Sequence, residues 1–191
     1  MKKTGLILSV FAMLVLTAFT AQNVWKVDKA HAEVGFSITH MGISDVSGTF
    51  DDFEATIKSE KEDFSDARVE AVINVASINT RIETRDEHLK GATFFDVEKY
   101  PRITFKSTAI HETGKGKYKL TGDLTAKGIT KKIELDLTYR GTVENPQSQK
   151  PSAGFKLSGA IKRSDFGIGA AIPAPVLSDE VQVTINAEFQ Q

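Results

Sequence analysis

Four consecutive residues, Arg85 to His88, are charged or titratable. Asp86 and His88 could act as an acid–base pair if a dry cavity tuned their pKa values. The same stretch also suits a short capped helix, because Thr84-x-x-Glu87 matches a capping box and Gly91 follows as a C-terminal residue that tolerates positive φ. The run therefore predicts a helix at about residues 85–90, and an acid–base pair is the alternative.

Other catalytic and metal-binding patterns are weak or absent in the sequence. It contains no G-x-S-x-G nucleophile motif, no phosphate-binding glycine loop and no H-E-x-x-H. With no Cys, thiolate chemistry is excluded. His31 and Glu33 form one pair of possible metal ligands and Asp86 and His88 another, but the spacing places no third ligand beside either. We predict no catalytic residue, no metal site and no cofactor.

Alternation of apolar and polar residues with a period of two dominates the chain and indicates β-strands, so any site must be positioned by strands. Ile133, Leu135, Leu137 and Tyr139, for example, alternate with charged or polar residues. Turn residues such as Gly114-Lys-Gly116 separate these runs. Eight strands are predicted, at 32–40, 46–59, 67–78, 102–111, 117–126, 129–144, 152–163 and 180–190.

Eight mostly sequential antiparallel strands favour closure into a barrel, which removes exposed edges. A barrel of this size holds either a packed core or a cavity for one small ligand. The fold class is thus all-β, an eight-stranded antiparallel barrel with a short helix near one end, and a two-sheet β-sandwich is the alternative. Small inner-face residues argue against a solid core: Ala67, Ala71, Gly122, Gly159 and Ala187.

The first residues have the character of a targeting segment. Lys2 and Lys3 precede the apolar run 5–19, and Ala18, Thr20 and Ala21 offer a cleavage site. Residues 1–21 are therefore expected to be a cleavable signal peptide, and 22–191 a single exported domain, periplasmic or extracellular. An uncleaved anchor is the alternative. No membrane span is expected after cleavage.

Charge gives no sign of a polyanionic partner. Without Lys2 and Lys3 the chain has 22 basic and 25 acidic residues, a net of −3. We therefore expect neither nucleic-acid binding nor electrostatic binding to an anionic membrane. A homodimer stays open, because an exposed strand edge leaves no clear mark in composition.

Two polar residues are separated by even numbers of positions from inward-facing apolar residues, a relation that we call shared parity and that places them on the same face of a strand. His40 continues the series Val34, Phe36, Ile38, and Arg163 continues the series of 155, 157, 159 and 161. A charge on the inner face needs a partner, and a ligand head group could supply it. Alternatively each strand has ended and the side chain faces water, or Arg163 pairs with Asp165 or Asp86.

Two apolar segments lie outside the predicted strands. Phe94 and Phe95 follow the predicted helix, and we expect them to fold over an apolar surface such as a barrel end, as core or in contact with a ligand. Residues 168–177 (IGAAIPAPVL) carry no charge and two prolines. They predict an irregular loop that serves either as a lid or as packing.

The order of several motifs resembles the YceI family of exported lipid-binding proteins. They are Trp25-x-x-Asp28-x-x-His31, Phe36, His40, Gly48-x-Phe50, Thr84-Arg-Asp-x-His88-Leu, Phe94-Phe-Asp96, Tyr100-Pro-x-Ile-x-Phe105, Gly122-x-Leu124, Gly128-Ile-Thr130 and Arg163-x-Asp-Phe-Gly167. The resemblance implies a lipocalin-like barrel whose apolar interior holds a polyisoprenoid or a similar amphiphile.

Parity and resemblance together predict a protein that sequesters or carries a polyisoprenoid, an isoprenoid quinone or a fatty-acid-like lipid. The candidate head-group residues are His40, Arg85, His88 and Arg163. The candidate tail residues are Phe36, Ile38, Phe50, Ile73, Phe94, Phe95, Phe105, Leu135, Leu137, Phe155 and Leu157. An enzyme acting on a lipid in the cavity and a solid-core stress-protective protein are the alternatives.

Overall fold

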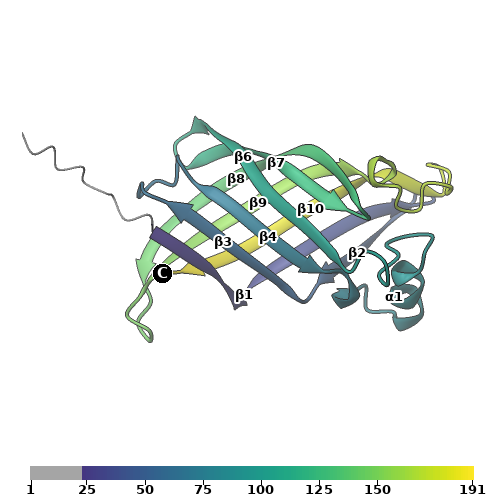
Figure 1. Cartoon of the computed structure of the whole chain (residues 1–191), viewed down its shortest axis with the longest axis horizontal. Helices are drawn as coiled ribbons and strands as arrows, with labels where there is room; N and C mark the ends of the chain where they lie inside the picture. The colour runs from purple at the N-terminus through teal and green to yellow at the C-terminus, as the bar shows by residue number, and fades with distance from the viewer. Residues whose placement is uncertain (1–22) are drawn as a thin grey trace, which may run out of the picture.

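A computed structural model describes residues 23–191, so the predicted signal peptide lies outside the described residues. The described chain is a barrel of long strands with one short α-helix (Figure 1). Its elements are β1 (Asn23–His40), β2 (Ser44–Phe50), β3 (Phe53–Ser59), β4 (Arg68–Asn74), η1 (Val75–Ser77), β5 (Ile78–Asn79), α1 (Glu83–Lys90), β6 (Arg102–Gly114), β7 (Lys117–Ala126), β8 (Ile129–Glu144), β9 (Pro151–Lys162), η2 (Arg163–Phe166) and β10 (Leu177–Gln190).

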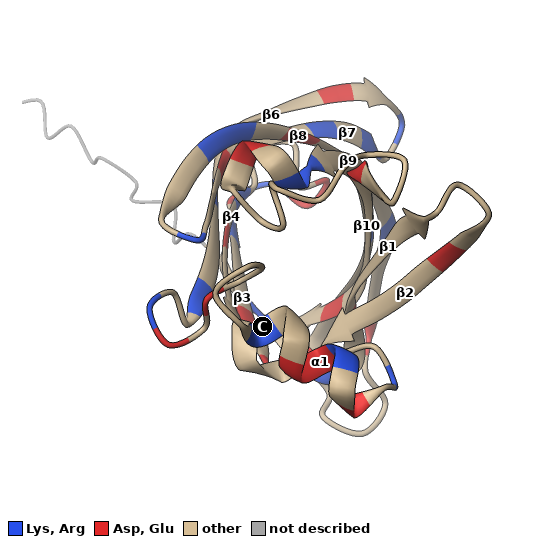
Figure 2. Ribbon diagram, turned by 90° about the vertical axis from the view of Figure 1, so that its right-hand side faces the viewer, with Lys and Arg blue, Asp and Glu red and all other residues tan. Residues whose placement is uncertain are grey.

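Eight of the strands close on themselves. The order around the barrel is β1-β3-β4-β6-β7-β8-β9-β10, and β10 returns to pair with β1 (Figure 2). The start of β1 pairs with β3, and the second half of β1 pairs with β2. Strand β5 pairs only with the end of β2. The predicted antiparallel barrel is confirmed, and the two-sheet sandwich is wrong because the β1–β10 pairing closes the sheet.

Strand boundaries differ from the prediction where the backbone departs from regular pairing. The first strand begins at Asn23 rather than at 32, because a bulge between Asp28 and Ala32 breaks its alternation. The predicted strand 46–59 divides at Asp51 and Asp52, whose backbone N–H groups bond to Ser77 instead of to a neighbouring strand. The predicted strand 67–78 ends at Asn74, which caps η1 with its side chain.

One end of the barrel is closed by aromatic packing, and we call it the closed end. The loop between β3 and β4 places Phe64 inside the barrel, where its ring packs against Trp25, Tyr139 and Phe155 at centroid distances of 5.3, 5.0 and 4.9 Å. The hydroxyl of Tyr118 donates to the Asp63 carbonyl at 2.6 Å and so fastens the same loop. These residues form a solid plug beneath the interior.

The opposite end, which we call the mouth, carries α1 and the loops 40–44, 91–101, 126–129 and 163–177. Lys127 joins three of these segments: its ammonium donates to the carbonyls of Ala92 at 2.8 Å and Gly167 at 3.1 Å. The Gly169 N–H donates to the Thr93 carbonyl at 2.9 Å. The loops over the mouth are therefore tied to one another as well as to the strands.

The helix forms where the sequence predicts it, but it is capped differently. It starts at Glu83, so Thr84 lies inside the first turn and Ile82 is the N-cap, without a side-chain capping bond. The predicted capping box is therefore wrong. Gly91 does end the helix, although with an extended backbone (φ −68°) instead of a left-handed one. The helix is held by its side chains: Asp86 Oδ1 accepts from the Thr80 N–H at 2.8 Å and from its hydroxyl at 2.5 Å.

Candidate functional site: an apolar cavity open toward the mouth

The interior between the aromatic plug and the mouth is a cavity of about 510 Å³. Its walls are almost entirely aliphatic and aromatic side chains from the inner faces of the strands. The volume lies within the usual range for small-molecule sites, about 300–1,000 Å³. A cavity with such walls favours the hydrocarbon part of a ligand over water.

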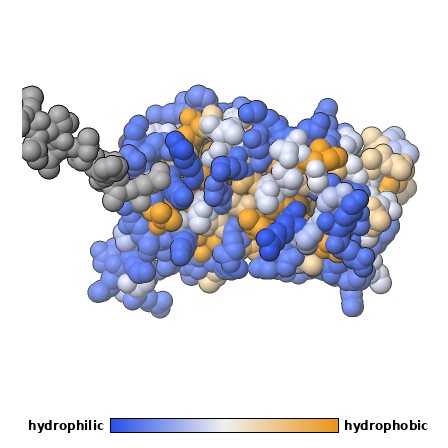
Figure 3. Space-filling view, viewed as in Figure 1, coloured by the Kyte–Doolittle hydropathy of each residue, from blue (hydrophilic) through white to orange (hydrophobic). Residues whose placement is uncertain are grey.

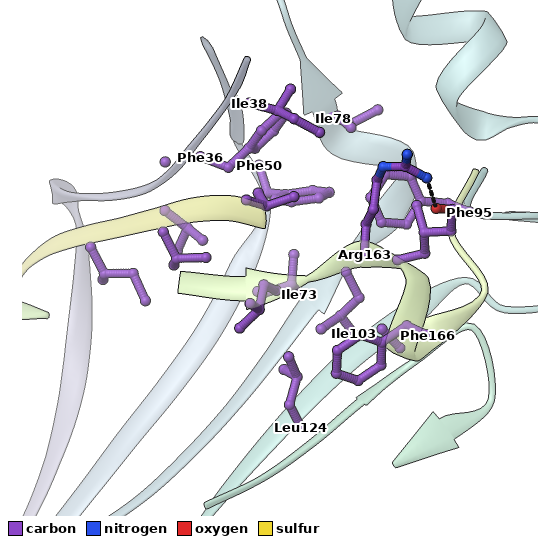
Figure 4. A pocket seen from close by; sticks show the side chains of 18 of the residues that line it. Phe36, Ile38, Phe50, Ile73, Ile78, Phe95, Ile103, Leu124, Arg163 and Phe166 are labelled. Atoms are coloured by element: carbon purple, nitrogen blue, oxygen red, sulfur yellow. Dashed lines mark hydrogen bonds between the residues drawn. The ribbon is translucent and has the colours of Figure 1, made fainter. Parts of the chain in front are cut away.

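Most of the candidate tail residues line this cavity. Figure 4 shows labelled side chains, among them Phe36, Phe50 and Ile73, converging from different strands on one interior space. The predicted tail residues in the lining are Phe36, Ile38, Phe50, Ile73, Phe94, Phe95, Phe105, Leu135 and Leu157. At the mouth, Phe95 meets Phe50 edge-on at 5.8 Å between centroids.

Two candidate tail residues lie elsewhere. Leu137 and Phe155 point inward, as their parity requires, but both belong to the packed cluster at the closed end and not to the cavity wall. Parity determines which face a side chain occupies and leaves open how far along the barrel axis it lies. Only the position of the Phe64 plug separates wall from floor.

Several lining residues are not among the candidates predicted from the sequence. Val181, Val183 and Ile185 of β10 line the cavity, and their alternation alone could have identified them. Ile103, Leu124, Ile133 and Ile161 follow the same rule on other strands. Ile168, Ile172 and Val176 could not be found in this way, because they come from an irregular loop.

The small inner-face residues have two different roles. Ala71 and Ala187 line the cavity. A Cβ at Gly122 would lie 2.4 Å from the Phe105 ring, and one at Gly159 would lie 2.7 Å from Leu135. These two glycines therefore make room for large neighbouring side chains, so they do not themselves indicate an empty interior.

Three of the candidate head-group residues lie together around the mouth. His40 ends β1 and is exposed, Arg85 and His88 come from α1, and all three line the cavity. Arg85 Nε donates to the Thr80 hydroxyl and Nη2 to the Thr80 carbonyl, both at 2.7 Å. The His88 ring packs edge-on against Phe94, with centroids 5.1 Å apart. A polar head group at the mouth could therefore meet an arginine and two imidazoles.

Arg163 also borders the cavity, but its N–H groups already have protein partners. The side chain is 4% exposed, and it begins η2 just beyond the end of β9. Nε donates to the Ser178 carbonyl at 3.0 Å, Nη2 to the carbonyls of Ile172 and Leu177, and Nη1 to those of Ile168 and Gly169. The expected partners Asp86 and Asp165 are not among them. Arg163 thus holds the 168–177 loop to the barrel.

The Asp86 and His88 side chains do not form an acid–base pair in this arrangement. Asp86 Oδ1 is occupied by Thr80, whereas His88 contacts Phe94 and the cavity. In the described part of the chain no hydrogen bond joins the two side chains. The geometry therefore favours a helix-fastening role for Asp86.

A small polar cluster at the β1 bulge is the one group of possible metal ligands found within residues 23–191. His31 Nδ1 lies 2.9 Å from Asp28 Oδ2, and one ligand atom each of Asp28, His31 and Glu188 lie within 4.8 Å of one another. Glu33, the predicted partner of His31, is not in the cluster. The amide of Gln190 also donates to Asp28 at 2.9 Å. These hydrogen bonds already hold Asp28 and His31 together.

This cluster gives stability a pH dependence. The hydrogen bond to Asp28 raises the pKa of His31 above its ordinary 6.5, and the same bond lowers the pKa of Asp28 below 3.8. The pair therefore stabilises the fold between about pH 3.8 and 6.5, and its contribution is lost as pH rises through the His31 pKa or falls through that of Asp28. His31→Asn should lower the melting temperature in this window by an amount of order 1 °C, because the pair is exposed.

Melting curves from pH 3 to 9 for the two proteins test this prediction, with His111→Asn, another exposed histidine, as the control. A difference between His31→Asn and the original protein that stays constant across the range would contradict it.

No helix within residues 23–191 is long and apolar enough to cross a membrane.

Comparison with known proteins agrees with this architecture. The family model described as a YceI-like domain matches residues 25–189. Protein YceI of Salmonella arizonae is 37% identical over 194 residues, which cover 100% of this chain and 99% of the relative. The same identity and coverage hold for Protein YceI of Salmonella paratyphi B. The expected resemblance is thus confirmed along the whole chain.

Solved structures show the same barrel. BcnA of Burkholderia cenocepacia superposes with a TM-score of 0.76 at 27% identity, covering 85% of this chain and 98% of that one. A Campylobacter jejuni YceI protein gives 0.71 at 36% identity, with coverage of 86% and 95%. A polyisoprenoid binding domain from Saccharophagus degradans gives 0.65 at 15% identity, with coverage of 87% and 97%, and so shares the fold. This chain belongs to the YceI family.

Proposed function

We propose that the protein is an exported carrier that sequesters a long apolar amphiphile, such as a polyisoprenoid, an isoprenoid quinone or a fatty-acid-like lipid, inside the barrel. The observation that carries the proposal is the 510 Å³ cavity, with its aliphatic and aromatic walls, a closed aromatic floor and polar residues gathered at the mouth. A solid-core protective protein would have no such space.

Binding would be driven by burial of the hydrocarbon chain. Each buried methylene contributes about 0.8 kcal/mol, so a chain of a dozen carbons gains roughly 10 kcal/mol before the costs of ordering. His40, Arg85 and His88 at the mouth would orient an oxygen-bearing head group. Arg85 is best suited to this role, because its Nη1 has no hydrogen-bond partner within residues 23–191.

Two further considerations support this class of ligand. A structural relative from Saccharophagus degradans is described as a polyisoprenoid binding domain, and it has the same fold at low identity. In addition, no constellation of nucleophile, base and oxyanion-stabilising groups faces the cavity within the described residues, which favours a binding protein over an enzyme. Export is proposed from the positively charged and apolar start of the sequence.

Native mass spectrometry of the protein recovered from the exported fraction tests the proposal, followed by solvent extraction of any adduct. We expect a stoichiometric adduct of several hundred daltons that extracts into organic solvent. We also expect a cleaved leader, visible as a protein mass lacking about the first 21 residues. A bare protein that takes up neither added isoprenoids nor quinones would refute the carrier function, and absence from the exported fraction would refute export.

A further inference from the structure

Exposed apolar side chains gather at the mouth end of the barrel. Of the eight large hydrophobic residues exposed within residues 23–191, five belong to the mouth loops or their edges: Met41, Ile43, Ile82, Ile129 and Val176. Ile43 is 85% exposed and Met41 is 59% exposed, and both lie at the tip of the β1–β2 hairpin. In Figure 3 the upper right of the molecule, where Figure 1 draws the 163–177 loop, is largely pale or orange, whereas the part over α1 is blue.

Three of these residues form one patch beside the cavity, which we call the mouth patch: Met41, Ile43 and Val176. The Met41 N–H donates to the Val176 carbonyl at 2.9 Å, so the hairpin tip and the 163–177 loop are joined directly. Val176 itself lines the cavity, as does His40 next to Met41. The patch is therefore continuous with the cavity wall.

The backbone of the hairpin tip supports a role for Met41 beyond folding. Met41 and Gly42 both adopt left-handed conformations, with φ of 51° and 70°. Such turns strongly favour Asn-Gly, and an unbranched apolar residue at the first position is uncommon. The chain thus keeps an exposed methionine at a position where asparagine would suit the turn better.

Few formal charges lie near the patch in sequence, and the nearest are Asp45 and Asp179. Residues 34–44 and 166–178 contain no Asp, Glu, Lys or Arg. In Figure 2 the hairpin is tan around its tip. Burying these segments in an apolar phase would therefore desolvate few ionic groups. A surface without cations is matched to neutral or zwitterionic lipid, whereas an anionic membrane would select Lys and Arg.

We propose that the mouth patch inserts into the interface of a neutral lipid bilayer and brings the cavity to the membrane to load or release its ligand. The inference rests on the proposed function in one respect: an amphiphile that fills this cavity is stored in bilayers. A projecting hairpin tip with two apolar side chains fits the headgroup region, where apolar groups bury to about 5–10 Å. A protein partner would instead call for anchors such as Trp, Tyr or Arg, which the patch lacks.

Flotation with phosphatidylcholine vesicles tests the proposal. The sample is the protein recovered from cells after any processing of its N-terminus. The variant Met41→Asn/Ile43→Asn removes both apolar tips, and Asn at position 41 is compatible with the left-handed turn. Its vesicle-bound fraction at limiting lipid should fall about tenfold. The control is Val143→Asn, which removes a 69% exposed valine near the closed end and should bind vesicles as the original protein does. Binding should not depend on salt, because no ion pairs with lipid are involved.

Equal flotation of the double variant and the original protein would overturn the inference. So would vesicle binding that requires anionic lipid, or a change from dimer to monomer in sedimentation without a change in flotation, which would make the patch a contact between two copies. The proposed function is assessed separately with farnesol, which is short enough to be delivered without vesicles. Farnesol binding with no effect of the double variant on flotation removes only the membrane inference. If the double variant floats less than the original protein but the original protein binds no farnesol, only the carrier function is removed.

Discussion

Ala71→Trp is expected to reduce affinity for a long isoprenoid by at least a hundredfold while leaving the barrel folded. Ala71 lies on the inner face of β4 and lines the cavity. An indole at this position would occupy space that the hydrocarbon chain needs. Displacing about four methylenes removes roughly 3 kcal/mol of burial, which is more than a hundredfold in affinity.

The neighbouring residue provides a matched control. Val72 is on the same strand, faces outward and does not line the cavity. Val72→Trp therefore adds the same side chain to the same strand on the opposite face, and it should bind ligand normally. Because the pair differ only in the face that carries the indole, a general effect of tryptophan on β4 is separated from obstruction of the cavity.

Ligand-dependent melting gives the readout. At a ligand concentration 100 times the Kd, binding stabilises the fold by about 2.7 kcal/mol, or about 5–10 °C for a domain of this size. The original protein and Val72→Trp should show this shift, and Ala71→Trp should not. If Ala71→Trp lost its fold, the graded series Ala71→Val and Ala71→Leu would still show affinity falling with volume. Unchanged affinity across a folded series would mean that the ligand binds elsewhere.

The alternation of side chains was sufficient to predict much of the site, because strand geometry enforces it. Phe36 and Ile38 on β1 and Leu135 on β8 face the cavity as their positions require. Depth was not predictable in this way. Leu137 and Phe155 share the inner face, yet they pack around Phe64, which arrives from a loop that no strand pattern includes. The floor of the cavity is thus set by a single long-range insertion.

Local irregularities account for the other differences. The bulge between Asp28 and Ala32 hides the first part of β1 from any test of alternation. The helix lacks the predicted cap because it starts at Glu83, one residue before Thr84, and Asp86 instead binds Thr80 in the segment that leads from β5 into α1. In both cases the difference depends on a bend of the backbone that residue types alone leave undetermined.

Arg163 shows how a correct inward placement can lead to an unexpected partner. From the sequence, a charge on the inner face is expected to need a partner, either a ligand oxygen or a carboxylate. In the structure the counterpart is a set of carbonyls from Ile168 to Ser178, which converge because the loop folds back over its own base. We therefore expect Arg163 to act mainly on the loop and only indirectly on the ligand.

Arg163→Met should consequently lower the free energy of unfolding by about 3 kcal/mol or more, since bonds to a charged donor are worth roughly 1.5–3 kcal/mol each and five buried or part-buried carbonyls lose their donor together. For a chain of this length the melting temperature should fall by about 10 °C. Arg163→Lys should recover only part of the loss, because an ammonium has three donors and no planar fork. Lys162→Met, at the adjacent exposed position, is the control and should be nearly neutral.

Limited proteolysis distinguishes loss of the loop from loss of a head-group contact. If Arg163 holds the loop, cleavage in Arg163→Met should begin within residues 167–177 at temperatures where the barrel is still folded. Affinity for farnesol should then fall only as far as Ile172 and Val176 leave the cavity wall. A variant that melts like the original protein, resists cleavage in the loop and yet loses affinity for amphiphiles with a polar head would instead assign Arg163 to the ligand. The five carbonyl bonds argue for the first outcome, because a head group in the cavity would have to compete with them for the guanidinium N–H groups.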